Sequence, residues 1–253
     1  MTETTANDNL APQPWRMANL RFTAFVSEMP FPENGGELFQ DFFGFTHDDE
    51  TCRKREFMSE FSSGKGGVLY QATISGPKVD FTVSPGISPG EVPDAMPSLP
   101  LEGDFETMFR DAAKRLVVET PKFVRLAVGA HFILPSAGKE AGYAAMQTFL
   151  PTVKIDPSGS SDFQYRINRR KDLQMSGKLV PINRLVTWGC LGFKLIMGTA
   201  AGVAHVGDAV SAMTDVNTDP NIDVASLTPT EQATIIETLF SSSRELAEKG
   251  DVV

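Results

Sequence analysis

The feature that most constrains the fold is a pair of apolar-patterned segments separated by a very short connection. Residues 67–74 and 79–84 have the patterning of strands, and Ser75-Gly76-Pro77-Lys78 between them has the composition of a turn. A connection this short joins antiparallel strands, because parallel neighbours need a crossover of a dozen or more residues. The chain is therefore expected to contain an antiparallel sheet.

Strand patterns recur along the rest of the chain. Apolar and polar residues alternate, or apolar residues run together between turn signals, in five further segments. These segments are residues 17–27, 123–134, 163–170, 184–197 and 209–216.

The clearest helix signal lies near the C-terminus. Thr228, Pro229 and Glu231 form a capping box with proline at the first helical position. Apolar residues then recur on one helical face as far as Ala247, and Gly250 ends the helix. Three other helices are expected at residues 37–43, from Asp104 to Leu116, and at residues 136–150.

The order of these elements indicates the fold class. Strands are grouped into hairpins with helices between the groups, instead of alternating strictly with helices. We therefore predict an α+β fold with a mainly antiparallel sheet, helices packed on one face of it, and a long amphipathic helix at the C-terminal end. The sequence shows no internal repeat.

Proline placement leaves two alternatives for the domain organisation. Residues 1–15 read as a polar, flexible tail, and residues 16–253 as a single α+β domain. Five prolines between residues 85 and 103 interrupt both ladder and helix hydrogen bonds. This loop either lies within one domain or joins two lobes, residues 16–84 and 104–253.

Composition narrows the protein class. The chain has 253 residues, a net charge of −9, two cysteines and no Asn-x-Ser/Thr site. Two cysteines form no disulfide framework, so we predict a cytoplasmic protein. The longest apolar run, residues 185–206, contains Lys194 and four glycines, which favours buried strands over a membrane span.

The most informative functional feature is a local concentration of positive charge. Residues 166–194 carry seven Lys or Arg and a single Asp in an otherwise acidic chain. Alternation places apolar residues on one face of the 163–170 strand and cations on the other. The residues that we call the basic strip, and predict as the binding residues, are Arg166, Asn168, Arg170 and Lys171.

Two interpretations of the basic strip are open. Arginine forks in line on a sheet face suit an acidic partner protein or a phosphate-bearing ligand. Alternatively, the cations pair with acidic neighbours of the same chain. Nucleic acid ranks last, because Phe163 and Tyr165 point away from the cationic face and the whole chain is acidic. A protein partner, including a second copy of the chain, is expected, and neither a membrane nor a cofactor is.

His131 and Arg125 are the candidates for catalysis. In the strand of residues 123–134 they lie an even number of residues apart, so both project from the same face. His131 is interpreted either as an acid, base or anion contact, or as a structural histidine bonded within the fold.

Oxygen-bearing side chains follow one another at every second position late in the chain, which is how a calcium loop surrounds its ion. Pro220 replaces the glycine of such a loop, and Ser226 replaces its bidentate glutamate. The alternative is a polar turn whose side chains bond their own backbone, and no metal is therefore assigned. The candidate ligands are Asp215, Asn217, Asp219 and Asp223.

The order of segments resembles an uncharacterised family of bacterial hypothetical proteins of about this size. The resemblance is carried by the early strand NLRFTAF, the central strand RLAVGAHFIL, the late strand ending in VNTDP, and the closing amphipathic helix. It spans most of the chain and implies no activity.

Together these features predict a non-catalytic binding protein that uses the basic strip. The alternative is an enzyme, a hydrolase or a nucleotide-handling protein, in which His131, Arg125 and the carboxylates from Asp215 to Asp223 converge in one cleft.

Overall fold

The computed structural model describes most of the chain. The predicted tail, apart from Trp15, lies outside the described residues, as does much of the proline-rich loop. The described residues are 15–27, 35–87, 93, 95–101, 103–119, 123–175, 177–196 and 203–251.

The described strands form one antiparallel sheet of ten strands. Its order is β2-β3-β4-β5-β1-β6-β10-β9-β7, and β8 also pairs with β9. The strands are β1 (Arg16–Val26), β2 (Asp49–Arg53), β3 (Met58–Lys65), β4 (Val68–Ser75), β5 (Lys78–Pro85), β6 (Phe123–Ser136), β7 (Gln164–Asn168), β8 (Lys171–Met175), β9 (Lys178–Ile196) and β10 (Val203–Thr218).

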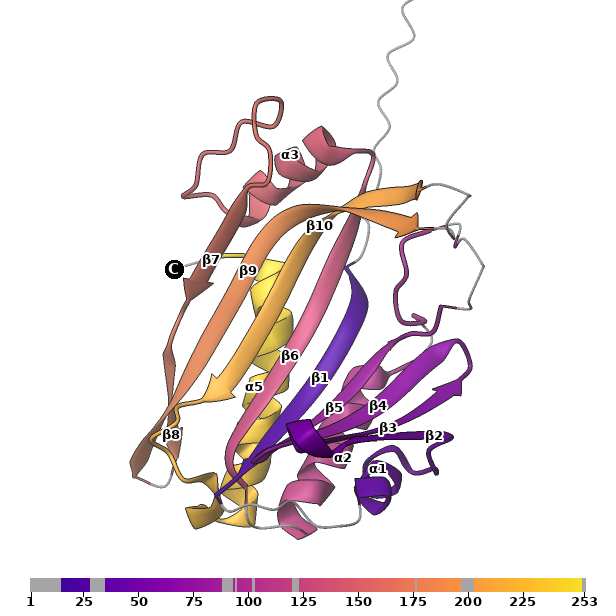
Figure 1. Cartoon of the computed structure of the whole chain (residues 1–253). Helices are drawn as coiled ribbons and strands as arrows, with labels where there is room; N and C mark the ends of the chain where they lie inside the picture. The colour runs from indigo at the N-terminus through magenta and orange to yellow at the C-terminus, as the bar shows by residue number, and fades with distance from the viewer. Residues whose placement is uncertain are drawn as a thin grey trace, which may run out of the picture.

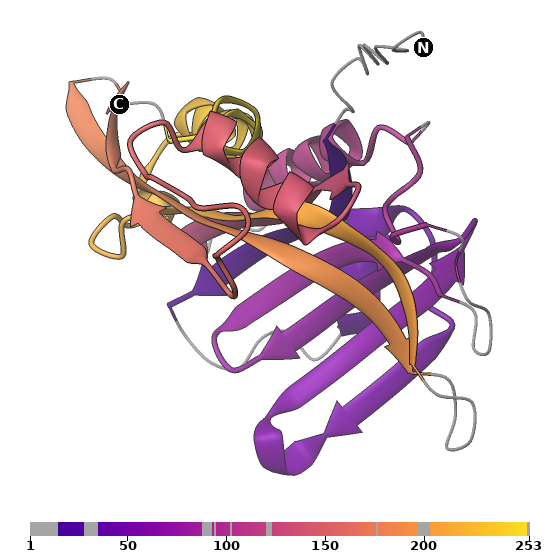
Figure 2. The same ribbon diagram turned by 90° about the horizontal axis from the view of Figure 1, so that it is seen from above.

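The helices cover one face of this sheet. Figure 2 shows α2, α3 and α5 on the same side. On that side, Phe42 of α1 stacks on Phe81 with ring centroids 3.9 Å apart, and Phe149 of α3 stacks on Trp188 at 5.3 Å. The predicted α+β fold is therefore confirmed. The helices are α1 (Gly35–Phe43), α2 (Phe105–Glu119), α3 (Lys139–Phe149) and α5 (Pro229–Lys249), with short 3-10 turns η1 (Lys54–Glu56) and η2 (Val224–Ser226).

Alternation along the strands separates the two faces. In β5, Val79, Phe81 and Val83 are fully buried toward the helices, whereas Lys78 and Asp80 project from the opposite side. Burial of these apolar side chains supplies the main driving force for packing helices on the sheet. We call the opposite, uncovered side the helix-free face.

The C-terminal helix begins and ends where the sequence predicts. Thr228 Oγ1 accepts a hydrogen bond from the Glu231 N–H at 3.3 Å, and the Glu231 carboxylate accepts one from the Thr228 N–H at 2.9 Å. Gly250 terminates the helix with a φ of 75°. None of the described helices has the length and apolar character required to cross a bilayer.

Three strands, β2, β3 and β8, were not predicted. Residues 52–56 were expected to be an exposed connection, but β2 pairs with β3 at one edge of the sheet, and η1 follows β2. Every residue of β2 is exposed, so this strand carries no apolar alternation that could reveal it. In addition, β8 follows β7 after two residues, where the sequence predicted only one strand through residue 170.

The two halves of the chain repeat one order of elements. A strand, a helix, a group of hairpin-connected strands and a second helix occur as β1 to α2 and again as β6 to α5. The first strands of the halves, β1 and β6, pair with each other at the centre of the sheet, as Figure 1 shows. One continuous sheet therefore runs through both predicted lobes.

The described end of the proline-rich loop lies at one end of the sheet. Met96 packs with Ile133 and Ala209 in a small apolar cluster on the helix-free face. Leu99 belongs to the main core, and its N–H donates to the Met17 carbonyl at 2.7 Å. The chain thus passes around the end of β1 from one face of the sheet to the other.

Candidate functional site

A hollow of about 300 Å³ lies on the helix-free face. Five neighbouring strands contribute to it, namely β1, β6, β10, β9 and β7. We call it the charged hollow, because charged side chains from separate strands meet there. The residues on which the site depends are Arg21, His131, Arg166, Thr187, Met213 and Asp215.

Strand register brings these side chains together. Arg166 lies opposite Thr187 on β9, Thr187 lies opposite Met213 on β10, and Met213 lies opposite His131 on β6. Directly opposite residues are about 5 Å apart at Cβ. Because Thr187 is smaller than its neighbours in this row, the surface is depressed between Arg166 and Met213.

A glycine opens the second row of the hollow. Gly129 lies between Arg21 and Asp215, and a Cβ atom added to it would lie 3.0 Å from Arg21 Nη2. The Arg21 side chain uses this space to cross β6, and its Nη2 lies 3.5 Å from Asp215 Oδ2. Arg21 Nε also lies 4.0 Å from Asp80 Oδ1. Asp80 also pairs with Lys78, whose Nζ lies 2.7 Å from Asp80 Oδ2, so the two carboxylates offset the charges of Arg21 and Lys78 together.

Arg166 has a different electrostatic environment. It projects from the exposed positions of β7, and within the described part of the chain no carboxylate forms an ion pair with it. The charged hollow therefore contains one arginine without an offsetting acid. A guanidinium in this state presents several N–H donors toward solvent.

His131 is partly buried between strands and bonded within the fold. Its Nε2 lies 2.8 Å from Ser211 Oγ, and Ser211 is only 5% exposed. Burial lowers the pKa of His131 below its ordinary value, because desolvation penalises the charged ring. The imidazole is consequently neutral near pH 7, which fits the structural interpretation of this residue.

Arg125 lies on the predicted face but outside the charged hollow. Its Nη2 donates to Asn217 Oδ1 at 2.9 Å, and its guanidinium lies over the Phe25 ring at 5.2 Å. The structure thus brings His131, Arg166 and Asp215 together and leaves Arg125 at another place on the sheet.

The basic strip does not form one continuous face. Arg166 and Asn168 lie on β7, but Asn168 Oδ1 accepts the Arg184 N–H at 2.9 Å and is occupied. Arg170 follows the end of β7, and its Nη2 lies 3.2 Å from Asp219 Oδ2. Lys171 pairs with Ile182, whose side chain is buried toward the helices. The basic strip is divided because the chain breaks between β7 and β8, so side chains do not alternate between the two faces without interruption from Arg166 to Lys171.

Neighbouring arginines are neutralised internally. Arg169 Nε donates to Asp251 Oδ1 at 2.7 Å, and Arg184 Nη2 donates to Glu245 Oε2 at 2.9 Å. Arg170 pairs with Asp219 in the same way, and these three arginines carry much of the local positive charge. The interpretation that the cations pair with acidic residues of the same chain therefore holds for these three arginines but not for Arg166.

The candidate metal ligands do not converge. Asp215 Oδ1 accepts from Asn217 Nδ2 at 2.8 Å, whereas Asp219 accepts from the Asn221 N–H at 2.9 Å. Asp223 caps η2 by accepting the Ala225 N–H at 3.1 Å. Nowhere in the described ranges do three or more His, Cys, Asp or Glu residues form a cluster that could hold a metal ion. From Asp219 to Asp223 the segment has the geometry of the polar turn.

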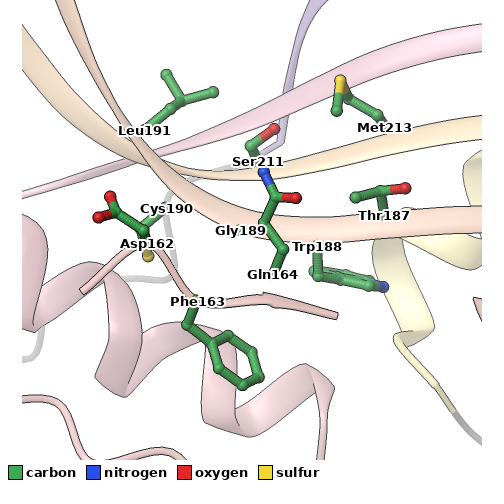
Figure 3. A pocket seen from close by; sticks show the side chains of 10 residues that line it. All are labelled: Asp162, Phe163, Gln164, Thr187, Trp188, Gly189, Cys190, Leu191, Ser211 and Met213. Carbon is green, nitrogen blue, oxygen red and sulfur yellow. The ribbon is translucent and has the colours of Figure 1, made fainter. Parts of the chain in front are cut away.

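A second hollow of about 180 Å³ adjoins the charged hollow. The two share Thr187 and Met213. Figure 3 shows Thr187, Leu191 and Met213 on one side of the ribbon and the Trp188 ring on the other. Met213 was not predicted as a site residue, although it lies between Ser211 and Asp215 on β10 and projects from the same face as both of them.

Comparison with known proteins found no matching family model, no matching curated protein and no matching solved structure. The resemblance to bacterial hypothetical proteins stays a prediction.

Proposed function

We propose that this protein is a non-catalytic binding protein that holds an anionic group of its ligand at Arg166 in the charged hollow. One observation carries the proposal: Arg166 is exposed and lacks an ion pair among the described residues, whereas Arg169, Arg170 and Arg184 are each paired with an acid. A guanidinium fork matches the two oxygens of a carboxylate or the oxygens of a phosphate.

The surroundings of Arg166 support an anion. Thr187, which lies opposite Arg166 on β9, adds a hydroxyl group beside the guanidinium. No Phe, Tyr or Trp lines the charged hollow, so the base stacking that single-stranded nucleic acids require has no platform there. The anionic group is carried by a small ligand or by an acidic partner protein, a second copy of this chain included. The two cysteines are free thiols, in keeping with a cytoplasmic protein.

Binding is better supported than catalysis. The enzyme alternative required Arg125 and the carboxylates near residue 220 beside His131, but of these carboxylates only Asp215 lines the same hollow. Ser211, which bonds His131, is buried and so poorly placed to attack a substrate.

The test is a titration with inorganic phosphate and with acetate at low ionic strength, followed by NMR chemical shifts. We expect Arg166→Gln to weaken binding by about tenfold or more, since a hydrogen bond to a charged group contributes about 1.5 to 3 kcal/mol. Lys171→Gln, on the helix side of the adjacent strand, is the matched control and should bind as the unaltered protein does. Equal binding by both variants would refute the role of Arg166.

A further inference from the structure

Met213 is a large apolar side chain exposed on the helix-free face. It is 47% exposed at the centre of the sheet, between the small Thr187 on β9 and His131 on β6. Met213 lines both hollows, so it supplies apolar surface directly beside the charged side chains. The flexible thioether of methionine also adapts well to apolar ligands.

A second apolar side chain lies beyond Met213 in the adjoining hollow. Leu191, in the second hollow, packs against the cluster formed by Met96, Ile133 and Ala209. Thr187 and Leu191 lie on the same face of β9, four residues and so about 13 Å apart. The adjoining hollows therefore form a path from Arg166 toward Leu191, and the polar residues Asp162, Gln164 and Ser211 also line its second part.

Gly189 keeps this path open. It lies between Thr187 and Leu191 on the same face of β9 and leaves a gap in the surface there. A Cβ atom added to Gly189 would have its nearest neighbour, the Phe163 carbonyl oxygen, at 3.5 Å, which is ordinary contact. The Gln164 side chain borders this space, because its Cγ would lie 3.7 Å from the added Cβ, and Figure 3 shows it running past Gly189 toward Ser211. A larger residue at Gly189 would therefore narrow the space beside Gln164 without backbone strain.

The number of charges limits the ligand further. Arg21 is offset by Asp215 and Asp80, so Arg166 alone remains to neutralise a ligand. A single guanidinium matches the charge of one carboxylate, whereas it offsets only part of the charge of a dianionic phosphate. Burial of methylene groups on Met213 and Leu191 would add affinity through the hydrophobic effect.

We infer that the two hollows together bind a small carboxylic acid with an unbranched apolar chain. The carboxylate lies at Arg166, and the chain passes over Thr187 and Met213 into the gap at Gly189, toward Leu191. The anion contact is the one in the proposed function, and the new element is the apolar chain and its path.

The inference is tested with octanoate, acetate and octanol as probes, below the micelle-forming concentration, by calorimetry and NMR. Octanoate should bind about tenfold or more tightly than acetate, because burial of two of its methylene groups suffices for that difference. Octanol should bind more weakly than octanoate, since it lacks the charge that Arg166 pairs with.

Variants separate the two parts of the site. Gly189→Val should reduce octanoate affinity to that of acetate and leave acetate binding unchanged, whereas Arg166→Gln should weaken both. Gly64→Val is the matched control, because Gly64 lies on β3 with no atom within 4 Å of an added Cβ, far from the path. Met213→Ser, at an exposed site, gives a second test if Gly189→Val fails to fold.

The outcomes distinguish the inference from the proposed function. If acetate and octanoate bind equally and both depend on Arg166, the apolar path is refuted while the anion site stands. If octanoate binds tightly and Arg166→Gln has no effect, the anion contact is refuted and so is the orientation inferred here. Absence of saturable octanoate binding, or unchanged binding in both Gly189→Val and Met213→Ser, also refutes the inference.

Discussion

At the scale of single residues, a buried carboxylate near the C-terminus holds the strand that carries Arg166. The Asp251 side chain is 0% exposed and accepts hydrogen bonds from Tyr165 Oη at 2.6 Å and from Arg169 Nε and Nη2 at 2.7 and 2.9 Å. Tyr165 and Arg169 flank Arg166 in sequence, so Asp251 fixes the end of β7 from the helix side. The bonds from Arg169 and Tyr165 lower the pKa of Asp251.

We therefore expect Asp251→Asn to lower the free energy of unfolding at pH 7 by about 2 kcal/mol, the usual contribution of charge-assisted hydrogen bonds. Because the folded-state pKa is lowered, this stabilisation is present above the ordinary aspartate pKa of about 3.9 and is lost as the pH falls toward the folded-state value. Urea unfolding at pH 7 and at pH 3 would measure the difference, which should shrink in acid.

The control for this variant is Asp172→Asn, at an exposed position of β8. Its stability should equal that of the unaltered protein at both pH values. A constant difference between Asp251→Asn and the unaltered protein at all pH values would contradict the charge-based explanation.

At the scale of elements, the helices and strands that were predicted correctly are those whose ends are marked by capping or turn residues in the sequence. The capping box at Thr228 and the hairpin turn at Ser75–Lys78 lie within a few residues of sequence, and both were predicted correctly. Strands β2 and β8 lie at or beside the sheet edges, where exposed positions need no apolar alternation. The break between β7 and β8, which redirects Arg170 and Lys171, was missed for the same reason.

The N-cap of α5 gives a prediction at this scale. Thr228→Ala removes the side-chain bond to the Glu231 N–H and should destabilise the protein by about 1 kcal/mol, the usual effect of losing an N-cap. Thr230→Ala, an exposed position in the first turn of the same helix, is the control and should change stability little. Thermal and urea unfolding would measure both variants. Equal effects would show that the cap contributes nothing specific.

At the scale of the whole molecule, the pairing of β1 with β6 joins the two repeated halves into one sheet. The core is also continuous, because α2 of the first half and α5 of the second pack side by side. A sheet and core shared in this way should unfold as one cooperative unit.

This cooperativity can be tested across the halves. Phe81 is fully buried in the first half, against Phe42, and Trp188 is buried in the second half, against Phe149. Phe81→Ala should destabilise the protein by about 3 to 5 kcal/mol and shift the unfolding followed by tryptophan fluorescence by the same amount. Phe57→Ala, at a 75% exposed residue, is the control. An unchanged tryptophan transition would instead support two independent lobes.

The sequence by itself determined the α+β class, the antiparallel pairing and the C-terminal helix, because alternation, short turns and caps act between residues close along the chain. It also singled out Arg166 as part of a cationic segment. Only the tertiary structure decided which cations are neutralised and which side chains share a hollow. Asp251 reaches Arg169 from 82 residues away, and Met213 meets Arg166 only through the register of three strands. Such pairings depend on the packing of the whole sheet, and no local pattern encodes them.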